Sequence, residues 1–284
     1  NGLTVATGNS AVDTATAPAA AAGSVNALTT ALDVLTGGDG PDTFAATSST
    51  VSGATVQTLN AGDNLTGGAG SDTLSLSNTS ATAAYGAGVT TSGIETLSIN
   101  GVTATNLDAS LMSGVTGVTN NGSLSAISVT GLAAIPSVSV LASSANTTVG
   151  MTAATTVGTA DEMSITLNGA SATAGSTITA AGIEKFTVNA SGTASGALAT
   201  PVTLTSANTT DVTITGNAAS AIAANLAGAS ATVQGTVTGN DAANTVVLTA
   251  AGTDKISVSL GAGDDVLSIG TIGATHTIAG GDGT

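Results

Sequence analysis

Two short segments of this chain combine glycines and aspartates in a pattern suited to binding a hard metal ion. The phrase Gly-Gly-x-Gly-x-Asp-x-(large apolar) occurs at residues 37–44 and again at residues 67–74. A further aspartate lies nine residues before the last one, so that Asp33 precedes Asp42 and Asp63 precedes Asp72. Glycines permit tight turns whose carbonyl oxygens converge. Calcium takes about six to eight oxygen ligands, so the pattern predicts calcium sites shared by successive turns.

A degenerate copy of the same phrase lies near the end of the sequence. Residues 261–267 keep Gly-x-Gly-x-Asp-x-Leu without the first glycine, and Asp254 precedes Asp265 by eleven residues instead of nine. A bulged coil would still bring these residues to an ion, with Asp282 contributing from the next turn. The alternative is that all these clusters are solvated turns, but the two matched copies favour calcium. The predicted metal ligands are Asp33, Gly37, Asp39, Gly40, Asp42, Asp63, Gly67, Ala69, Gly70, Asp72, Asp254, Gly261, Gly263, Asp264, Asp265 and Asp282.

The charge balance agrees with a need for bound cations. The chain has 17 acidic residues against two lysines, and its formal net charge is -15. Hard divalent cations are the natural counterions for such carboxylates. Without arginine the chain offers no bidentate phosphate contact, so nucleic acid is not an expected partner. The lack of cysteine excludes disulfides and thiolate metal sites.

Catalytic residues are not apparent, and we expect no enzymatic activity. His276 is the single histidine, which excludes a multi-histidine metal site. The acidic pairs Asp161-Glu162 and Asp264-Asp265 are chain neighbours, and neighbouring residues of a strand point to opposite faces. They are therefore poor candidates for a glycosidase pair, whose carboxyl groups must converge across a cleft.

Short strand patterns recur from residue 34 onward and predict an all-β protein. Apolar residues alternate with serine or threonine at 96–99, 127–130, 164–167, 202–205, 212–215 and 255–260, as in strands with one buried face. A β-sandwich would also give this spacing. A solenoid additionally explains the glycine–aspartate repeats and a core with only 1% aromatic residues. We therefore predict a right-handed parallel β-helix.

One repeated segment suggests a modular build. Gly-Ile-Glu followed by alternating residues occurs at 93–99 and 182–188, and its glutamate would either cap a turn or bind an ion. We expect residues 1–32 to be a linker or the edge of a preceding region. Residues 33–284 would form the solenoid, with two related halves at 33–160 and 161–284. The last residues stop within a motif, which suggests a fragment of a longer protein, and no apolar stretch reaches the roughly 20 residues of a membrane span.

The glycine–aspartate segments resemble the hemolysin-type calcium-binding (RTX) repeats of proteins exported by bacterial type I secretion. The resemblance is tight over 33–44 and 63–74, partial over 254–284, and absent as strict nonapeptides between about 100 and 240. Together with the Ala/Thr/Ser/Gly-rich composition and the Gly-Ile-Glu segments, the chain is similar to alphaproteobacterial surface-layer (S-layer) proteins of the Caulobacter type. This resemblance implies calcium-dependent folding outside the cell and self-assembly into a lattice on lipopolysaccharide, the anchor lying outside this chain. The alternatives are a segment of an RTX adhesin or matrix filament, and a repeat region attached to a secreted protease or lipase.

Overall fold

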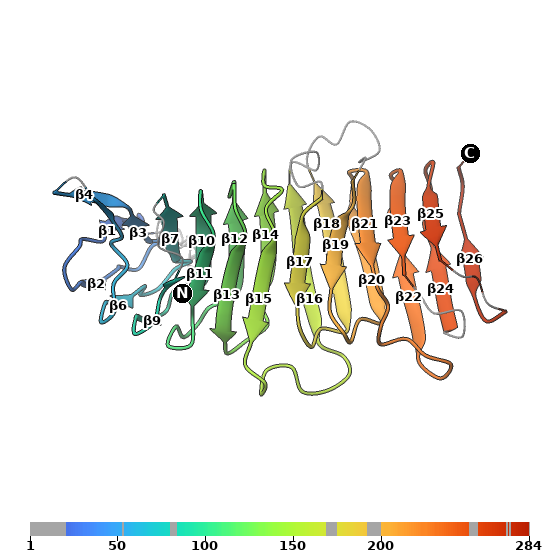
Figure 1. The fold of residues 1–284 in the computed structure, drawn as a ribbon, viewed down its shortest axis with the longest axis horizontal. Coiled ribbons are helices and arrows are strands. Elements are labelled where there is room, and N and C mark those ends of the chain that lie inside the picture. The colour runs from blue at the N-terminus through green and yellow to red at the C-terminus, as the bar shows by residue number, and fades with distance from the viewer. Residues whose placement is uncertain are drawn as a thin grey trace, which may run out of the picture.

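The computed structural model describes residues 21–52, 54–79, 84–168, 175–191, 200–249, 255–270, 272 and 274–283. These residues form an elongated stack of strands that runs from β1 to β26 (Figure 1). All strand pairs in the described part are parallel except one hairpin, β4 (Ser49–Val51) with β5 (Ala54–Val56). The prediction of an all-β parallel solenoid is therefore confirmed.

A 12-stranded parallel sheet, called the long sheet below, forms one face of the stack. Its strands, in hydrogen-bonding order, are β1 (Val25–Ala27), β3 (Thr43–Thr47), β7 (Thr73–Asn78), β10 (Thr96–Gly101), β12 (Gly117–Asn121), β14 (Ser137–Leu141), β16 (Glu162–Asn168), β18 (Lys185–Ser191), β20 (Asp211–Gly216), β22 (Gln234–Thr238), β24 (Lys255–Ser259) and β26 (Thr277–Ala279).

A nine-stranded and a three-stranded parallel sheet form the remaining faces. The nine-stranded sheet contains β8 (Ala84–Tyr85), β11 (Thr105–Asp108), β13 (Ile127–Leu132), β15 (Thr147–Met151), β17 (Thr177–Ala180), β19 (Val202–Thr205), β21 (Ser220–Ala224), β23 (Asn244–Leu248) and β25 (Val266–Ile269). The three-stranded sheet contains β2 (Val34–Thr36), β6 (Asn64–Thr66) and β9 (Thr90–Ser92).

The core consists of columns of aliphatic side chains that run along the stack. In the inner strands of the long sheet, such as β7 and β10, alternate residues are buried, because successive side chains of a strand point to opposite faces. The parallel register then places equivalent residues of neighbouring coils in line. One such buried column comprises Leu74, Leu97, Val118, Val138, Ile165, Val188 and Ile214. Every strand expected from the alternating pattern is present.

The register also shows what the nine-residue spacing means. Asp33 precedes β2 of the three-stranded sheet, whereas Asp42 precedes β3 of the long sheet, so the two residues lie at successive corners of one coil. The coil itself is longer, because β3 and β7 pair Thr43 with Thr73. Carboxylates of neighbouring coils are thus stacked at a spacing of 30 residues.

Candidate cation-binding site

The strongest candidate site is a row of carboxylates along one corner of the solenoid, here called the acidic column. It consists of Asp42, Asp72 and Glu95, which immediately precede β3, β7 and β10. Because the strands pair in register, these three residues stack on one another in successive coils. The structure therefore unites two predicted ligands with a glutamate that was not among them.

Backbone N–H groups hold each carboxylate of the acidic column in place. Asp72 Oδ1 accepts a hydrogen bond from the Asp42 N–H at 2.6 Å, and Glu95 Oε2 accepts one from the Asp72 N–H at 2.8 Å. At the start of the column, Asp42 Oδ1 accepts from the Ser24 N–H at 2.6 Å. Each side chain thus points toward the preceding coil, and the carboxylates follow one another along the axis.

Asp72 has one oxygen without a protein partner. The residue is 0% exposed, and its Oδ2 atom is buried without a hydrogen-bond partner, while Oδ1 accepts the bond described above. Burying a carboxylate oxygen without compensation is costly, so such an atom needs a further partner, which an ordered water molecule or a cation can supply.

The glycine turns beside the column pack closely against these carboxylates. A Cβ atom at Gly37 would collide with Asp42 Oδ2 and the carbonyl oxygen of Gly67. A Cβ atom at Gly67 would in turn collide with Asp72 Oδ2. The third glycine of this motif, Gly70, has φ +129°, a conformation that L side chains rarely adopt. The first glycine of each motif thus provides room for a carboxylate, which explains its place in the pattern.

The outer part of each turn faces solvent. Asp39 and Ala69 are exposed, Gly40 is buried, and the Ala69 N–H donates to the Gly38 carbonyl at 3.0 Å. Neighbouring turns are therefore joined directly through their backbones. The Asp39 carboxylate lies on the surface of this corner.

The other predicted aspartates, Asp33 and Asp63, form a second row in which every carboxylate oxygen has a partner, from the backbone alone for Asp63 and from the backbone and a hydroxyl for Asp33. Asp63 accepts from the Asp33 N–H at 2.9 Å and from the Asn60 N–H at 2.7 Å. Asp33 accepts from the N–H and the hydroxyl of Thr29 at 2.7 and 3.0 Å. These hydrogen bonds brace the corner before β2 and β6. No contact joins Asp33 to Asp42 or Asp63 to Asp72 among those described.

The C-terminal copy of the motif repeats part of this arrangement. Asp265 Oδ1 accepts the Asn244 N–H at 2.8 Å, and Asp265 Oδ2 is buried without a partner. The Gly263 N–H donates to the Asp282 carbonyl at 3.1 Å, which joins the two turns. Gly261 and Gly263 have φ of +89° and +111°. Asp254 lies outside the described residues, and Asp264 is adjacent to the orphaned carboxylate.

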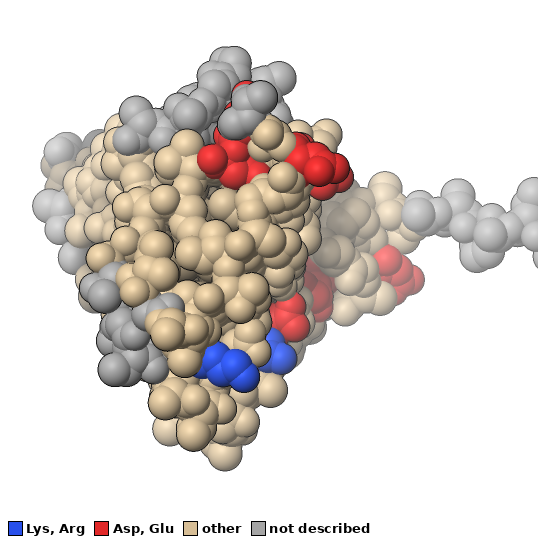
Figure 2. All heavy atoms as spheres, turned by 90° about the vertical axis from the view of Figure 1, so that its right-hand side faces the viewer, with Lys and Arg blue, Asp and Glu red and all other residues tan. Residues whose placement is uncertain are grey.

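Local hydrogen bonds favour the ionised form of Asp42. The hydroxyl of Ser24, then the N–H of Gly38 and that of Ser24, lower the pKa of Asp42 below 3.8, against the opposing effect of burial. Seen along the stack from its C-terminal end, acidic atoms form several patches, whereas basic atoms occupy one small area (Figure 2). Within the described ranges, no group of three or more His, Cys, Asp or Glu side chains comes together as a ready-made metal site.

The donor set of the acidic column fits a calcium ion whose protein ligands are partly backbone. Calcium prefers oxygen donors and tolerates irregular geometry, and two carboxylates can be completed by carbonyl oxygens and water. The buried, unpartnered Asp72 Oδ2 and the surrounding glycine carbonyls provide such donors. A bound dication would supply the positive charge that this corner lacks.

Comparison with known proteins adds no independent assignment. The chain matches no protein-family model, and no curated protein is significantly similar to it. Across the described residues, no helix is long and apolar enough to span a membrane.

Proposed function

We propose that this protein is a non-enzymatic structural module of a secreted bacterial cell-surface protein, and that bound calcium drives its folding and its self-assembly into an S-layer lattice. The single observation that carries the proposal is the acidic column, in which Asp72 is completely buried and has an oxygen atom without a partner. The biological setting comes from the resemblance of residues 33–44 and 63–74 to RTX repeats. That resemblance implies a right-handed coil and type I secretion.

Calcium would act by stabilising only the folded coils. A ligand that binds the folded state alone adds RT ln(1 + [L]/Kd), about 2.7 kcal/mol per site at a hundredfold excess over Kd. A few such sites amount to much of a typical domain stability of about 5–15 kcal/mol. Where free calcium is scarce, as inside a cell, the carboxylates would repel one another and the chain would remain loose enough for export. Outside the cell it would fold.

Assembly requires surfaces that approach one another despite the net charge of -15. The outward face of the long sheet would allow such an approach, because a row of small, partly exposed hydroxyl side chains without a charge crosses its strands. This row comprises Ser75, Ser98, Thr119, Ser139 and Thr166. Anchoring to lipopolysaccharide would depend on a region outside this chain.

The test is to compare the purified protein in calcium and in excess chelator, by far-ultraviolet circular dichroism and negative-stain electron microscopy. We expect a β-sheet spectrum and two-dimensional sheets in calcium, and loss of both after chelation. An unchanged spectrum and assembly state in chelator would contradict the proposal. One-dimensional fibres would indicate a matrix filament instead, and soluble folded monomers an adhesin spacer.

A further inference from the structure

The Gly-Ile-Glu segment occurs a second time in the middle of the solenoid, where no glycine–aspartate repeat is present. There Glu184 Oε2 accepts the Asp161 N–H at 2.9 Å across 23 residues. In the acidic column, Glu95 Oε2 accepts the Asp72 N–H at 2.8 Å across the same number of residues. Two acidic pairs far apart in the sequence therefore contain equivalent hydrogen bonds.

The backbone around the two pairs also corresponds bond for bond. The Asp161 carbonyl accepts the N–H groups of Glu184 and of the residue after it, at 3.1 and 3.0 Å. The Asp72 carbonyl accepts those of Glu95 and of the residue after it, at 3.2 and 3.0 Å. The glycine two residues before each glutamate has a positive φ, and the isoleucine between them is 0% exposed in both copies. The second pair is thus a structural copy of the first.

The copy extends to the unpartnered oxygen. Asp161 Oδ2 is buried without a hydrogen-bond partner, as Asp72 Oδ2 is. Glu184, whose carboxylate lies in the adjacent coil, is only 5% exposed. Two carboxylates one coil apart, one with a buried free oxygen, need a compensating positive charge or a proton.

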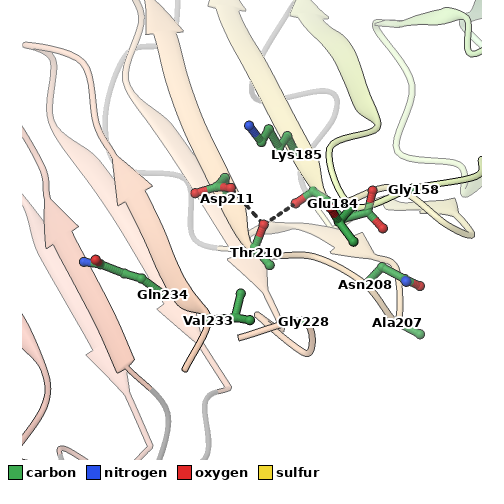
Figure 3. Close-up of a pocket in the computed structure, with 11 residues that line it drawn as sticks. Gly158, Glu184, Lys185, Ala207, Asn208, Thr210, Asp211, Gly228, Val233 and Gln234 are labelled. Atoms are coloured by element: carbon green, nitrogen blue, oxygen red, sulfur yellow. Dashed lines mark hydrogen bonds between the residues drawn. The ribbon is translucent and has the colours of Figure 1, made fainter. Parts of the chain in front are cut away.

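The nearby lysine does not provide that charge. Among the described contacts, Lys185 forms no ion pair with Asp161 or Glu184, and its side chain points away from the Glu184 carboxylate (Figure 3). In the long sheet Lys185 is instead paired with Glu162 of β16 on one side and with Asp211 of β20 on the other.

A pocket beside Glu184 opens to solvent. Its volume is about 510 Å³, and Asn208, Thr210 and Asp211 line it together with Glu184 (Figure 3). The Thr210 hydroxyl donates to Asp211 Oδ2 at 2.8 Å, so this carboxylate is already held in place. An ion can therefore reach Glu184 from solvent through this pocket, whereas the half-buried Asp161 lies outside its lining. The pocket offers further oxygen atoms to complete the coordination of such an ion.

We infer that Asp161 and Glu184 bind a divalent cation with a preference for oxygen ligands, at a site independent of the glycine–aspartate repeats. The inference applies the chemistry of the proposed function to a different pair of residues. Its consequence is a cation that fastens β16 to β18 in the middle of the solenoid. Calcium is the probe, because both carboxylates and the pocket offer hard oxygen donors.

The test uses the full chain and compares Asp161→Asn/Glu184→Gln with Glu162→Gln. The control removes a charge next to the site from an exposed side chain that accepts a hydrogen bond from the Thr187 hydroxyl. Isothermal titration with calcium should show one bound ion fewer in the double variant and an unchanged number in the control. The single variant Glu184→Gln, which keeps an acceptor for the Asp161 N–H, should raise Kd at this site at least about tenfold.

A local readout on the wild-type chain keeps the test independent of how the variants fold. Hydrogen exchange of the amides in 161–168 should slow on addition of calcium at constant pH. If exchange there is the same with and without calcium at constant pH, the inference is overturned. It is also overturned if Asp72→Asn removes a calcium ion while the double variant removes none, a result that leaves the proposed function standing. If wild type binds no calcium anywhere, both proposals fail.

Discussion

Replacing Asp72 with asparagine should change stability in opposite directions with and without calcium. Asparagine has the same shape and keeps an oxygen that accepts the Asp42 N–H, but it removes the negative charge and a calcium ligand. Without calcium, Asp72 and Glu95 repel each other. Strands of neighbouring coils lie about 4.8 Å apart, and two unit charges at that separation repel by about 3 kcal/mol at an effective dielectric constant of about 20.

The two effects give a measurable crossover. In chelator, Asp72→Asn should be more stable than wild type by up to about 3 kcal/mol. Calcium adds about 2.7 kcal/mol to wild type at a hundredfold excess over Kd and about 4.1 kcal/mol at a thousandfold excess. The free energy of unfolding of wild type should therefore be close to that of Asp72→Asn at the hundredfold excess and exceed it by about 1 kcal/mol at the thousandfold excess.

Urea unfolding followed by circular dichroism, repeated across a calcium series, measures this directly. Glu162→Gln is the matched control, since this exposed carboxylate lies outside the acidic column, and its stability difference should not depend on calcium. If Asp72→Asn is destabilised by the same amount in chelator and in calcium, Asp72 acts only as a hydrogen-bond acceptor and the reasoning is refuted.

Three further predictions concern the coil itself. Gly67→Ala would press a Cβ atom against a carbonyl oxygen of the next coil and should destabilise the protein by about 1–3 kcal/mol. Gly270→Ala meets no atom within 4 Å and should change the free energy of unfolding by less than about 0.5 kcal/mol; equal effects in a urea titration would contradict the role of the close approach. Leu97→Ala removes a completely buried side chain from the central aliphatic column and should cost about 2–5 kcal/mol in the same assay, and a smaller loss would show that the column repacks. Because hydrogen bonds, first that of the Ser24 hydroxyl, lower the pKa of Asp42 below 3.8, the ionised carboxylate stabilises the fold above that pH and this contribution is lost as the pH falls through the lowered pKa. An unfolding titration below about pH 4 should accordingly be shallower for Asp42→Asn than for wild type, and identical acid transitions would show that this carboxylate does not contribute.

The fold was predictable because its signal is local. Alternation of apolar and hydroxyl residues, as in 96–99, directly reports a strand with one buried face, and the structure has β10 there. Glycines at fixed positions indicate tight corners, and Gly70 has the positive φ that such a corner requires. The scarcity of aromatic residues agrees with a core that is mainly aliphatic, in which Phe44, Tyr85 and Phe186 are the aromatic side chains.

The partners of each carboxylate were not predictable, because they depend on coil length. The nine-residue spacing suggested that Asp33 and Asp42 act together, whereas the register stacks Asp42 on Asp72, since the segment between β3 and β6 lengthens this coil. The next coil is shorter, which brings Glu95 onto Asp72. A sequence motif fixes the shape of a corner, but the loops elsewhere in the coil decide which corners meet. The repeated Gly-Ile-Glu segment was the one available signal for the glutamate.

The most direct measurement is a crystal structure of the calcium-loaded chain with anomalous data collected to locate calcium. We expect an anomalous peak beside the buried Asp72 Oδ2, within coordination distance of carboxylate oxygens and glycine carbonyls of the adjoining turns. A map that shows the Asp72 carboxylate bound only to the Asp42 N–H, with no peak at this corner in calcium-containing crystals, would contradict the account.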